Sequence, residues 1–361
     1  MRNVVVVGGG VMGSAAAWSL APYAQVSVLE QFEPGHGRGS SHGSSRIFRL
    51  AYPDPFYVEL AARALPLWRE LEQESGQEIL DLTGAVDHGP RERVEPIEAA
   101  LRAAGRPGEI LAPAAAAERW PGLRFDEHVL FHPDAGRVHA DRATAAFRQV
   151  AAKSGADFRH GVRVASVTPA GHDRVEVVTD GGEVLVADAV VLAVGGWAPD
   201  LVARTVPGLP RLRVTQEQPV HFPAADPLSW PSFLHYRGAT GSEPGAYGLG
   251  SVDGVKVGFH GVGPQIDADR SDRAVDPAAL AKVVAYAERW VPGVDTSGAV
   301  ASTCLYTLTP DHDFVLDRHG AVTVLAGFSG HGFKFAPLIG RLAADLVAGQ
   351  RLPPRFALGV R

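Results

Sequence analysis

Residues 4–30, VVVVGGGVMGSAAAWSLAPYAQVSVLE, decide the fold class of this chain. Val4–Val7 is a continuous apolar run that ends in glycines, which is typical of a strand buried on both faces of a parallel sheet. Val11–Leu20 is rich in alanine and predicts a helix that stops near Pro22. Gln25–Leu29 predicts a second strand, so the stretch forms a βαβ unit with a right-handed crossover.

The glycines between this strand and helix predict a dinucleotide site. Gly8, Gly10 and Gly13 allow, in turn, a tight turn, the approach of a pyrophosphate to the backbone, and close packing of helix on strand. The helix N-terminus adds free N–H groups and the positive end of its dipole. Glu30 ends the second strand, where a carboxylate can bind a ribose and disfavours the 2′-phosphate of NADP. NAD and FAD both remain open.

The rest of the chain predicts an α/β protein with an antiparallel part. Helical spacing of apolar residues follows Pro55 and recurs over Asp141–Lys153 and Pro277–Trp290. A strand over Val322–Ala326, a glycine loop and a helix through Leu338, Leu342 and Leu346 follow. Four further runs predict strands: Val162–Val167, Val175–Thr179, Val184–Val186 and Ala189–Val194. Two segments suggest a second domain: the proline-rich crossing Thr205–Pro231 and the alternating stretch Gly245–His260.

Composition excludes several classes of protein. The 361 residues carry 34 Lys+Arg against 40 Asp+Glu, a net charge of −6, which argues against a non-specific nucleic-acid binder. A single cysteine excludes an intrachain disulfide and a cysteine-rich zinc site, and we predict no metal. No window reaches the ~20 unbroken apolar residues of a membrane span, and the glycines near the start disfavour a signal peptide. We therefore expect a soluble, cytoplasmic protein of roughly two domains.

Two further glycine loops follow predicted strands. Gly195-Gly196-Trp197 ends one strand and either accepts a long ligand or is an ordinary turn. Residues 327–334, GFSGHGFK, stand between a strand and a helix, where three glycines allow close approach to a flat ring. His331 and Lys334 bring polar groups to this loop, although Lys334 equally fits a solvated lysine at a helix start.

The roles of several cationic side chains stay open between two interpretations, whereas the lone thiol by itself has one. Arg46 and Arg49 fit either surface charges or a carboxylate clamp, to which the planar guanidinium is suited. Lys256 and His260, in GVKVGFH, would point to one face of a strand together with Gly258, in a site or toward solvent. Cys304, taken alone, is typical of a small buried hydrophobe.

Taken together, these segments resemble the monomeric sarcosine oxidase and N-methyltryptophan oxidase family, D-amino-acid-oxidase-like flavoproteins. The resemblance covers nearly the whole chain. The sequence segments on which the resemblance rests are VVGGGVMGSAAAWSLA, SSHGSSRIFRLAY, AVGGW, GVKVGFH, STCLYTLTPD and AGFSGHGFKFAP. Ser44-Ser45 departs from the family pattern, and residues 83–137 and 212–247 match only loosely, so the shape of the substrate pocket cannot be inherited.

The resemblance implies a role for each matching residue. Arg49 and Lys334 would hold the substrate carboxylate, and Lys256 would stand where O2 is reduced. Arg46 would lie beside the flavin, and His260 near the substrate, while Tyr306 and Tyr247 would line the pocket. Residues expected to contact FAD, with Cys304 linked through sulfur to the flavin 8α-methyl, are Gly8, Gly10, Val11, Met12, Gly13, Glu30, Ser41, His42, Arg46, Val164, Gly195, Trp197, Cys304, Gly327, Gly330, His331, Gly332 and Lys334.

The implied reaction is oxidation of a secondary amine of a small carboxylate, such as sarcosine or another N-methyl amino acid. The imine would hydrolyse, and O2 would become H2O2. Lys256 would stabilise negative charge developing on oxygen, and His260, with an ordinary pKa of about 6.5, would bias protonation of the amine. We expect a monomer with a discontinuous FAD-binding domain (1–82, 139–210 and 301–361) and a substrate-binding domain (83–138 and 211–300).

Three alternatives remain. One is a cyclic imino-acid or biosynthetic amine oxidase of the same fold. Another is a flavoprotein dehydrogenase that does not use O2, although Lys256 in its GVKVGFH setting favours the oxidase. A third, an NAD-dependent dehydrogenase, would leave Cys304 and the third glycine loop unexplained.

Overall fold

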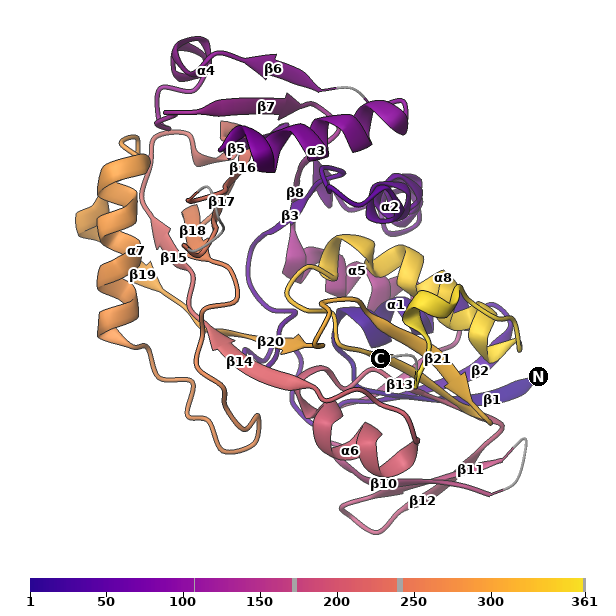
Figure 1. Cartoon of the computed structure of the whole chain (residues 1–361). Coiled ribbons are helices and arrows are strands. Elements are labelled where there is room, and N and C mark those ends of the chain that lie inside the picture. Colours follow the sequence, from indigo (N-terminus) through magenta and orange to yellow (C-terminus); the bar gives the residue numbers. More distant parts are fainter. Residues whose placement is uncertain (107, 171–173, 239–242, 360–361) are drawn as a thin grey trace.

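Two large sheets organise the computed structural model, which describes residues 1–106, 108–170, 174–238 and 243–359 (Figure 1). The first sheet contains the N-terminal βαβ unit, in which α1 spans Val11–Leu20. Its neighbouring strands are β21 (Val315–His319), β22 (Val322–Ala326), β13 (Ala189–Leu192), β1 (Arg2–Val7), β2 (Ala24–Leu29) and β9 (Asp157–Arg159). All pairs are parallel except β21 with β22. The predicted α/β class is confirmed.

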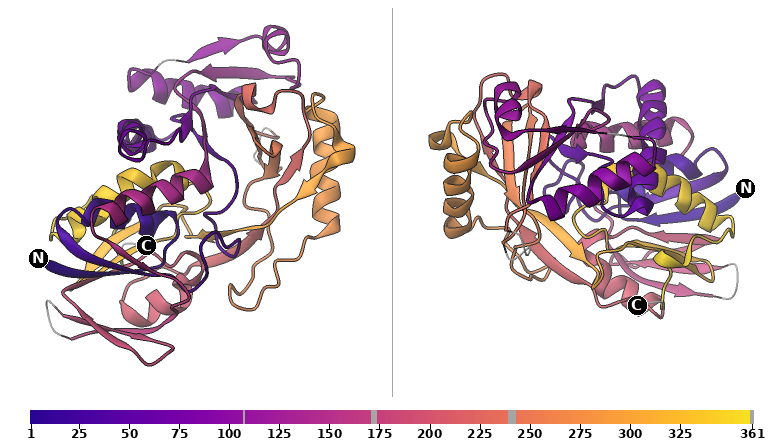
Figure 2. Two further views of the ribbon diagram at one scale, coloured as in Figure 1. Left: turned by 180° about the vertical axis from the view of Figure 1, so that it is seen from behind. Right: turned by 45° about the horizontal axis from the view of Figure 1, so that its top comes forward.

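The alternating valines of β1 explain how this sheet is covered on both faces. Val4 and Val6 pack among helices, whereas Val5 and Val7 pack in a separate core on the other side. The helical face carries α1, α2 (Pro55–Ser75), α5 (Ala140–Lys153) and α8 (Ala336–Val347). The other face carries β10 (Val164–Pro169), β11 (Val175–Thr179), β12 (Val184–Ala187) and α6 (Ala198–Thr205), as the view from behind shows (Figure 2).

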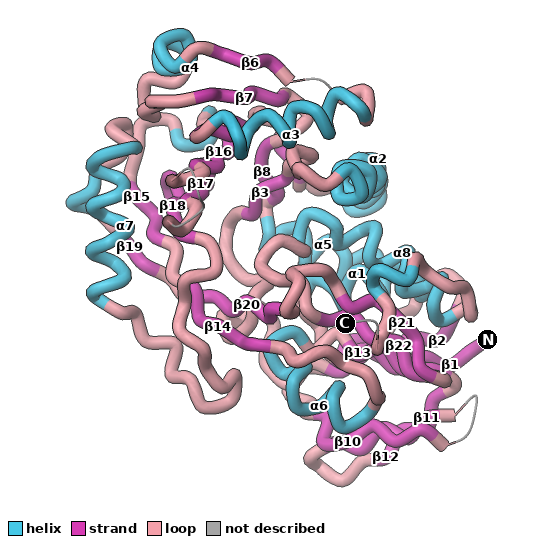
Figure 3. Tube along the Cα trace, in the orientation of Figure 1, coloured by secondary structure: helices cyan, strands magenta, loops and turns pink. Residues whose placement is uncertain are grey.

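The second sheet has eight strands and lies beside the first (Figure 3). Its order is β19 (Val300–Ala301), β15 (Val220–Phe222), β18 (Gly254–Phe259), β17 (Ala246–Ser251), β16 (Ser232–His235), β5 (Ala85–Gly89), β7 (His128–His132) and β6 (Glu109–Leu111). Its core includes residues of α4 (Pro113–Arg119) and α7 (Pro277–Trp290), while α3 (Arg91–Ala103) contacts β5 and β7.

Smaller elements connect the two sheets. One is a three-stranded sheet of β3 (Arg46–Phe48), β8 (Gly136–Val138) and β4 (Leu80–Asp81). The other is the antiparallel pair β14 (Arg213–Glu217) and β20 (Cys304–Leu308), on which the chain passes from one sheet toward the other (Figure 1). Short 3-10 turns lie at Gly195–Trp197, Pro227–Ser229, Thr296–Gly298, Phe333–Phe335 and Pro354–Phe356.

The predicted elements agree with the structure except near several strand ends. The bounds of α1, α7, β11 and β22 are those expected. The strand expected at Val162–Val167 begins at Val164, because the Val162 N–H donates to the Glu30 carbonyl and the register shifts before Ser166. The strand expected to reach Val194 ends at Leu192, because the chain then turns into the 3-10 turn at Gly195–Trp197. The proline-rich crossing also contains β14 and β15, which were not predicted.

Among the described residues, no helix combines the length and the apolar character that a membrane crossing requires. The division of the chain into the two predicted domains stays a prediction.

Candidate functional site

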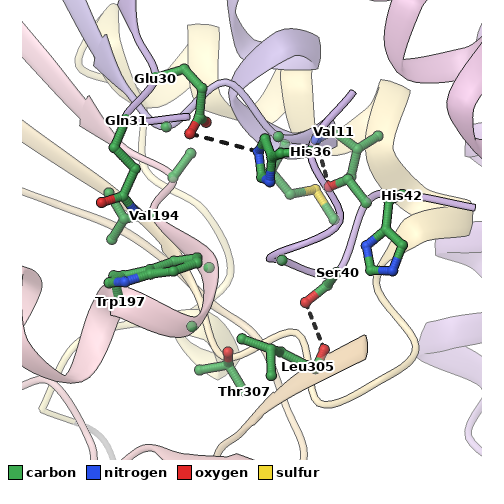
Figure 4. Close-up of a pocket in the computed structure, with 18 of the residues that line it drawn as sticks. Val11, Glu30, Gln31, His36, Ser40, His42, Val194, Trp197, Leu305 and Thr307 are labelled. Carbon is green, nitrogen blue, oxygen red and sulfur yellow. Dashed lines mark hydrogen bonds and ion pairs between the residues drawn. The ribbon is translucent and has the colours of Figure 1, made fainter. Parts of the chain in front are cut away.

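A cavity of about 1170 Å³ opens along the carboxyl ends of β1, β2 and β13, where all three glycine loops meet. This is the edge at which parallel α/β sheets bind ligands. Its walls include most of the residues predicted to bind a cofactor, together with Tyr306. These are Gly8, Gly10, Val11, Met12, Glu30, Ser41, His42, Arg46, Val164, Gly195, Trp197, Cys304, Gly327, Gly330 and Gly332. Figure 4 shows the view into it, with Glu30, Trp197, His42 and Leu305 on different sides.

Seven of the predicted residues do not line this cavity: Gly13, Arg49, Tyr247, Lys256, His260, His331 and Lys334. Gly13 has the packing role expected of it, because a Cβ there would lie 1.8 Å from the Gly8 carbonyl oxygen. Of the other six, His331 stands between the lining residues Gly330 and Gly332, and the remaining five are described below.

The first glycine loop has the geometry that the pattern predicts. Gly8 has φ +101°, and a Cβ at this position would lie 2.4 Å from the Ala193 carbonyl oxygen, so only glycine fits the turn. The helix α1 begins at Val11, whose N–H donates to the Ser41 Oγ at 2.9 Å. The helix N-terminus and the Gly/Ser-rich segment after β2 are therefore joined at the cavity wall.

Glu30 is held at the end of β2 by backbone donors. Its Oε2 accepts from the Gly9 N–H at 2.7 Å and its Oε1 from the Phe32 N–H at 3.0 Å. The His36 Nε2 lies 3.7 Å from Oε1, across the space shown in Figure 4. His36 and Arg148, which donates to the Gly9 carbonyl at 2.6 Å, line the same cavity and were missed in the sequence. Neither stands in a recognisable motif.

The cavity has polar groups that the protein itself leaves without partners. Among the described residues, His42 Nδ1 and Arg148 Nε are buried and make no hydrogen bond, although both side chains line the wall. Buried polar atoms of this kind call for a ligand or water. The volume, the glycine loops, the helix N-terminus and these two polar groups, an acceptor on His42 and a donor on Arg148, fit a dinucleotide as large as FAD.

Cys304 and Tyr306 face the cavity from one strand. They are two residues apart on β20, and four consecutive residues of this strand, Cys304 to Thr307, line the cavity. The Tyr306 ring lies against Gly330, where a Cβ would come within 2.2 Å of it. Burial raises the pKa of the Cys304 thiol, while Arg46 and Lys256 partly oppose the shift. Cys304 is half-buried at a cavity wall, so it is not simply a core residue.

Lys256 is a buried cation beside the Gly/Ser-rich segment. Its ammonium group donates to the Ser45 carbonyl at 2.5 Å, and the side chain is almost wholly inaccessible. Burial, reinforced by the charge of Arg46, lowers the pKa of Lys256 to about 7. Arg46 in turn donates to three carbonyls of the same segment, those of Ser40, His42 and Ser45. The solvent-facing alternative for Lys256 is wrong.

Arg49 and Lys334 meet at the side chain of Tyr52. The Lys334 Nζ donates to the Tyr52 hydroxyl at 2.9 Å, and the Arg49 guanidinium carbon lies 4.6 Å from the centre of the Tyr52 ring. Lys334 directly follows the cavity-lining Phe333, and its carbonyl accepts from the Trp68 indole. Burial, with Arg49 nearby, lowers the pKa of Lys334 well below its usual value. Lys334 is 5% exposed, so the solvated-lysine alternative is wrong as well.

Two more predicted residues surround this region. His260 lies one residue beyond β18, and its ring centre is 5.3 Å from that of Tyr306. Loss of hydration and nearby positive groups, including Arg49 and Lys334, lower the pKa of His260 to about 4, so the expectation of an ordinary pKa is wrong. Tyr247 lies against Gly258, where a Cβ would meet its hydroxyl at 2.8 Å.

Comparisons with known proteins agree with this arrangement. Residues 3–346 match the family described as FAD dependent oxidoreductase (DAO). A monomeric sarcosine oxidase from Streptomyces avermitilis is 36% identical, over 95% of this chain and 93% of its own length. An N-methyl-L-tryptophan oxidase from Yersinia pestis is 28% identical, over 95% and 94%. The solved structure of NikD, an amino acid oxidase essential for nikkomycin biosynthesis, is 27% identical with a TM-score of 0.86, over 99% and 97%.

Proposed function

This chain belongs to the DAO family of FAD-dependent oxidoreductases, and from that premise we propose that it oxidises a secondary amine of a small carboxylate, such as sarcosine or another N-methyl amino acid. The C–N single bond of the substrate becomes the C=N bond of an imine, and water hydrolyses this imine to a primary amine and a carbonyl compound. O2 takes up the two electrons and two protons to give H2O2.

The observation that carries this proposal is the meeting of two cationic side chains, Arg49 and Lys334, at Tyr52. They come from segments separated by almost the whole chain, and both are largely buried next to the third glycine loop. Arg49 already has an anionic partner in Asp87, but among the described residues Lys334 has none, and a buried positive charge is costly without an anion beside it. A substrate carboxylate supplies that anion, and its capture would hold the neighbouring carbon in a fixed orientation.

Bound FAD would supply the redox chemistry, as a two-electron acceptor for the C–H bond beside the amine nitrogen and a donor of those electrons to O2. The protein provides position and charge around it. The three glycine loops and Glu30 would hold the cofactor, with the N-terminus of α1 toward its phosphates. Tyr306, Tyr247 and His260 would enclose the amine end of the substrate.

Lys256 would act at the oxygen step. Its buried ammonium group lies beside Ser45 and Arg46, apart from the Arg49–Lys334 pair. A fixed positive charge stabilises the negative charge that develops as oxygen accepts electrons.

Cys304 would hold the flavin covalently. Its sulfur faces the cavity from β20, and Arg46 and Lys256 favour the thiolate against the effect of burial. A thiolate is the form that reacts, and these two cations offset part of the effect of burial. A thioether link would replace a C–H bond of the flavin methyl group by a C–S bond, and the two electrons would pass to the flavin and from it to O2.

A biosynthetic amine or cyclic imino-acid oxidase is the second candidate, favoured by the fold likeness to NikD along the whole chain. It would share the cofactor site and the carboxylate clamp and would differ in the substrate pocket.

The test is anaerobic mixing of the flavin-loaded protein with N-methyl and cyclic amino acids while the visible flavin band is followed. Bleaching by an N-methyl amino acid, followed by peroxide release on admission of air, is the expected result. Bleaching by cyclic substrates alone would favour the second candidate. Bleaching without peroxide on aeration would contradict the oxidase assignment and leave a dehydrogenase.

A further inference from the structure

A fully buried carboxylate lies behind Arg49. Asp87, in the middle of β5, has no exposed surface. Its Oδ1 accepts from the Tyr236 hydroxyl at 2.8 Å and from the Arg49 Nη1 at 3.2 Å, and its Oδ2 contacts the His132 Nε2 at 3.0 Å. Burial alone would raise the pKa of Asp87, but Arg49 and His132 outweigh it and lower the pKa, so the group stays anionic.

This carboxylate cannot itself bind a substrate. It has no accessible surface, and three side chains already occupy its two oxygens. A buried charge is retained when it is paired and hydrogen-bonded, and here the positive partner is the arginine of the proposed clamp. Apart from the long-range effect of its charge, any effect of Asp87 on the reaction therefore passes through Arg49.

The hydrogen bonds of Arg49 use only one end of its guanidinium group. Among the described residues, Nη1 makes all of them: to Asp87, to the Tyr236 hydroxyl at 3.4 Å and to the Ala51 carbonyl. The Nη2 and Nε groups of Arg49 have no hydrogen-bond partner among the described residues. These two donors form one edge of the planar fork, and that edge matches a carboxylate in a two-bond arrangement.

The anchor is built on a rigid part of the fold. Asp87 and His132 are diagonal neighbours on one face of the antiparallel pair β5–β7, in which Ala85 stands opposite His132. Tyr236 directly follows β16, which runs parallel to β5. Arg49 instead follows the short strand β3, so its long side chain reaches from one sheet to a fixed point on another.

We propose that Asp87, supported by Tyr236 and His132, is the positioning residue for Arg49, fixing Nη1 so that the Nε–Nη2 edge faces the substrate carboxylate. This inference rests on the proposed function, because it takes Arg49 to be the carboxylate clamp. The advantage is preorganisation: an arginine held in place before binding loses little freedom when the substrate arrives.

A purely electrostatic role for Asp87 predicts the opposite effect of substitution. Asp87 carries a negative charge next to the clamp, so its removal alone would strengthen the attraction for an anionic ligand. If positioning is the larger effect, removal weakens binding instead. The sign of the change in binding affinity therefore distinguishes the positioning role from the electrostatic one.

The test is titration of the flavin-loaded protein with methoxyacetate, a carboxylate with no oxidisable amine, followed by the visible flavin spectrum. In Asp87→Asn, which keeps the side-chain shape, we expect binding about 10- to 100-fold weaker, the range for loss of a hydrogen bond to a charged group. In Tyr236→Phe, which leaves the charges unchanged, we expect a smaller loss of the same sign. With an oxidised substrate, KM should rise while kcat changes less than about threefold.

Asp81→Asn is the matched control. Asp81 also pairs with an arginine and a histidine, Arg137 and His139, but it makes no contact with Arg49. Its substitution should leave methoxyacetate binding unchanged. Weakening by a similar factor in the control would show a general loss of structure and overturn the proposal.

Unchanged or tighter binding in Asp87→Asn also overturns the proposal while leaving the clamp itself intact. If Asp87→Asn fails to fold, Tyr236→Phe decides: weaker methoxyacetate binding supports the proposal, and unchanged or tighter binding overturns it. Failure of the unsubstituted protein to bind any carboxylate would refute both the clamp and its positioning.

Discussion

The oxygen step proposed for Lys256 should depend on pH, with a sign that follows from the low pKa of this side chain. Burial and Arg46 lower this pKa to about 7, compared with 10.5 for a free lysine side chain. The ammonium form predominates below pH 7 and is lost above it. If only that form assists O2, the rate should follow the protonated fraction, which falls from about one half at pH 7 to about one hundredth at pH 9. We therefore expect reoxidation to slow about fifty-fold over this interval.

The assay is to reduce the flavin anaerobically with substrate, mix it with oxygenated buffer between pH 6 and 9, and follow the return of the visible band. Lys256→Met is the reference variant, since it removes the charge while keeping much of the side-chain volume. Its oxygen step should be slow and independent of pH, with flavin reduction by substrate little changed. A flat profile in the unsubstituted protein, or the same titration in Lys256→Met, would refute the assignment.

Other predictions concern the clamp, the thiol and the packing of α8 against α1. Arg49→Ala should raise KM for a carboxylate substrate about 100-fold or more, checked by saturation kinetics; unchanged saturation would contradict the clamp. Cys304→Ala should release flavin into the supernatant after acid denaturation, and flavin that stays with the protein would place the link elsewhere. Gly340→Ala should destabilise the fold by about 1–3 kcal/mol in thermal unfolding, because its Cβ would lie 2.3 Å from the Ala15 carbonyl oxygen between α8 and α1. Gly181→Ala, whose nearest neighbour is 3.7 Å away, is the control and should change stability little.

The βαβ unit could be predicted almost to the residue because its signals are local. The valine run, the three glycines and the alanine-rich helix act within thirty residues, and burial on both sides of β1 follows from the unbroken apolar pattern. Strand ends were less accurate where tertiary contacts decide them, as at Val162, which bonds to the Glu30 carbonyl rather than extending β10.

The residues around Arg49 could not be predicted from local patterns. Asp87, His132 and Tyr236 come together only through the pairing of β5 with β7 and β16, and none stands in a motif. Tyr52 ends the motif SSHGSSRIFRLAY, but it was not singled out there. One signal was present: Asp87 interrupts the apolar start of AVDHG, and an acid within a buried strand requires a partner. The sequence could not say that this partner is Arg49, thirty-eight residues earlier.

The order of the strands also determines when the site can exist during synthesis of the chain. β1 is made first, but its neighbour β13 follows nearly two hundred residues later, and β22 must then pair with β13. Cys304, on β20, and Lys334, after β22, are among the last parts of the site to leave the ribosome. If Cys304 attaches the flavin and Lys334 helps to hold the carboxylate, as proposed, both events have to wait until the chain is almost complete. On that proposal, a chain truncated before residue 304 would carry the glycine fingerprint but no means of holding its cofactor covalently.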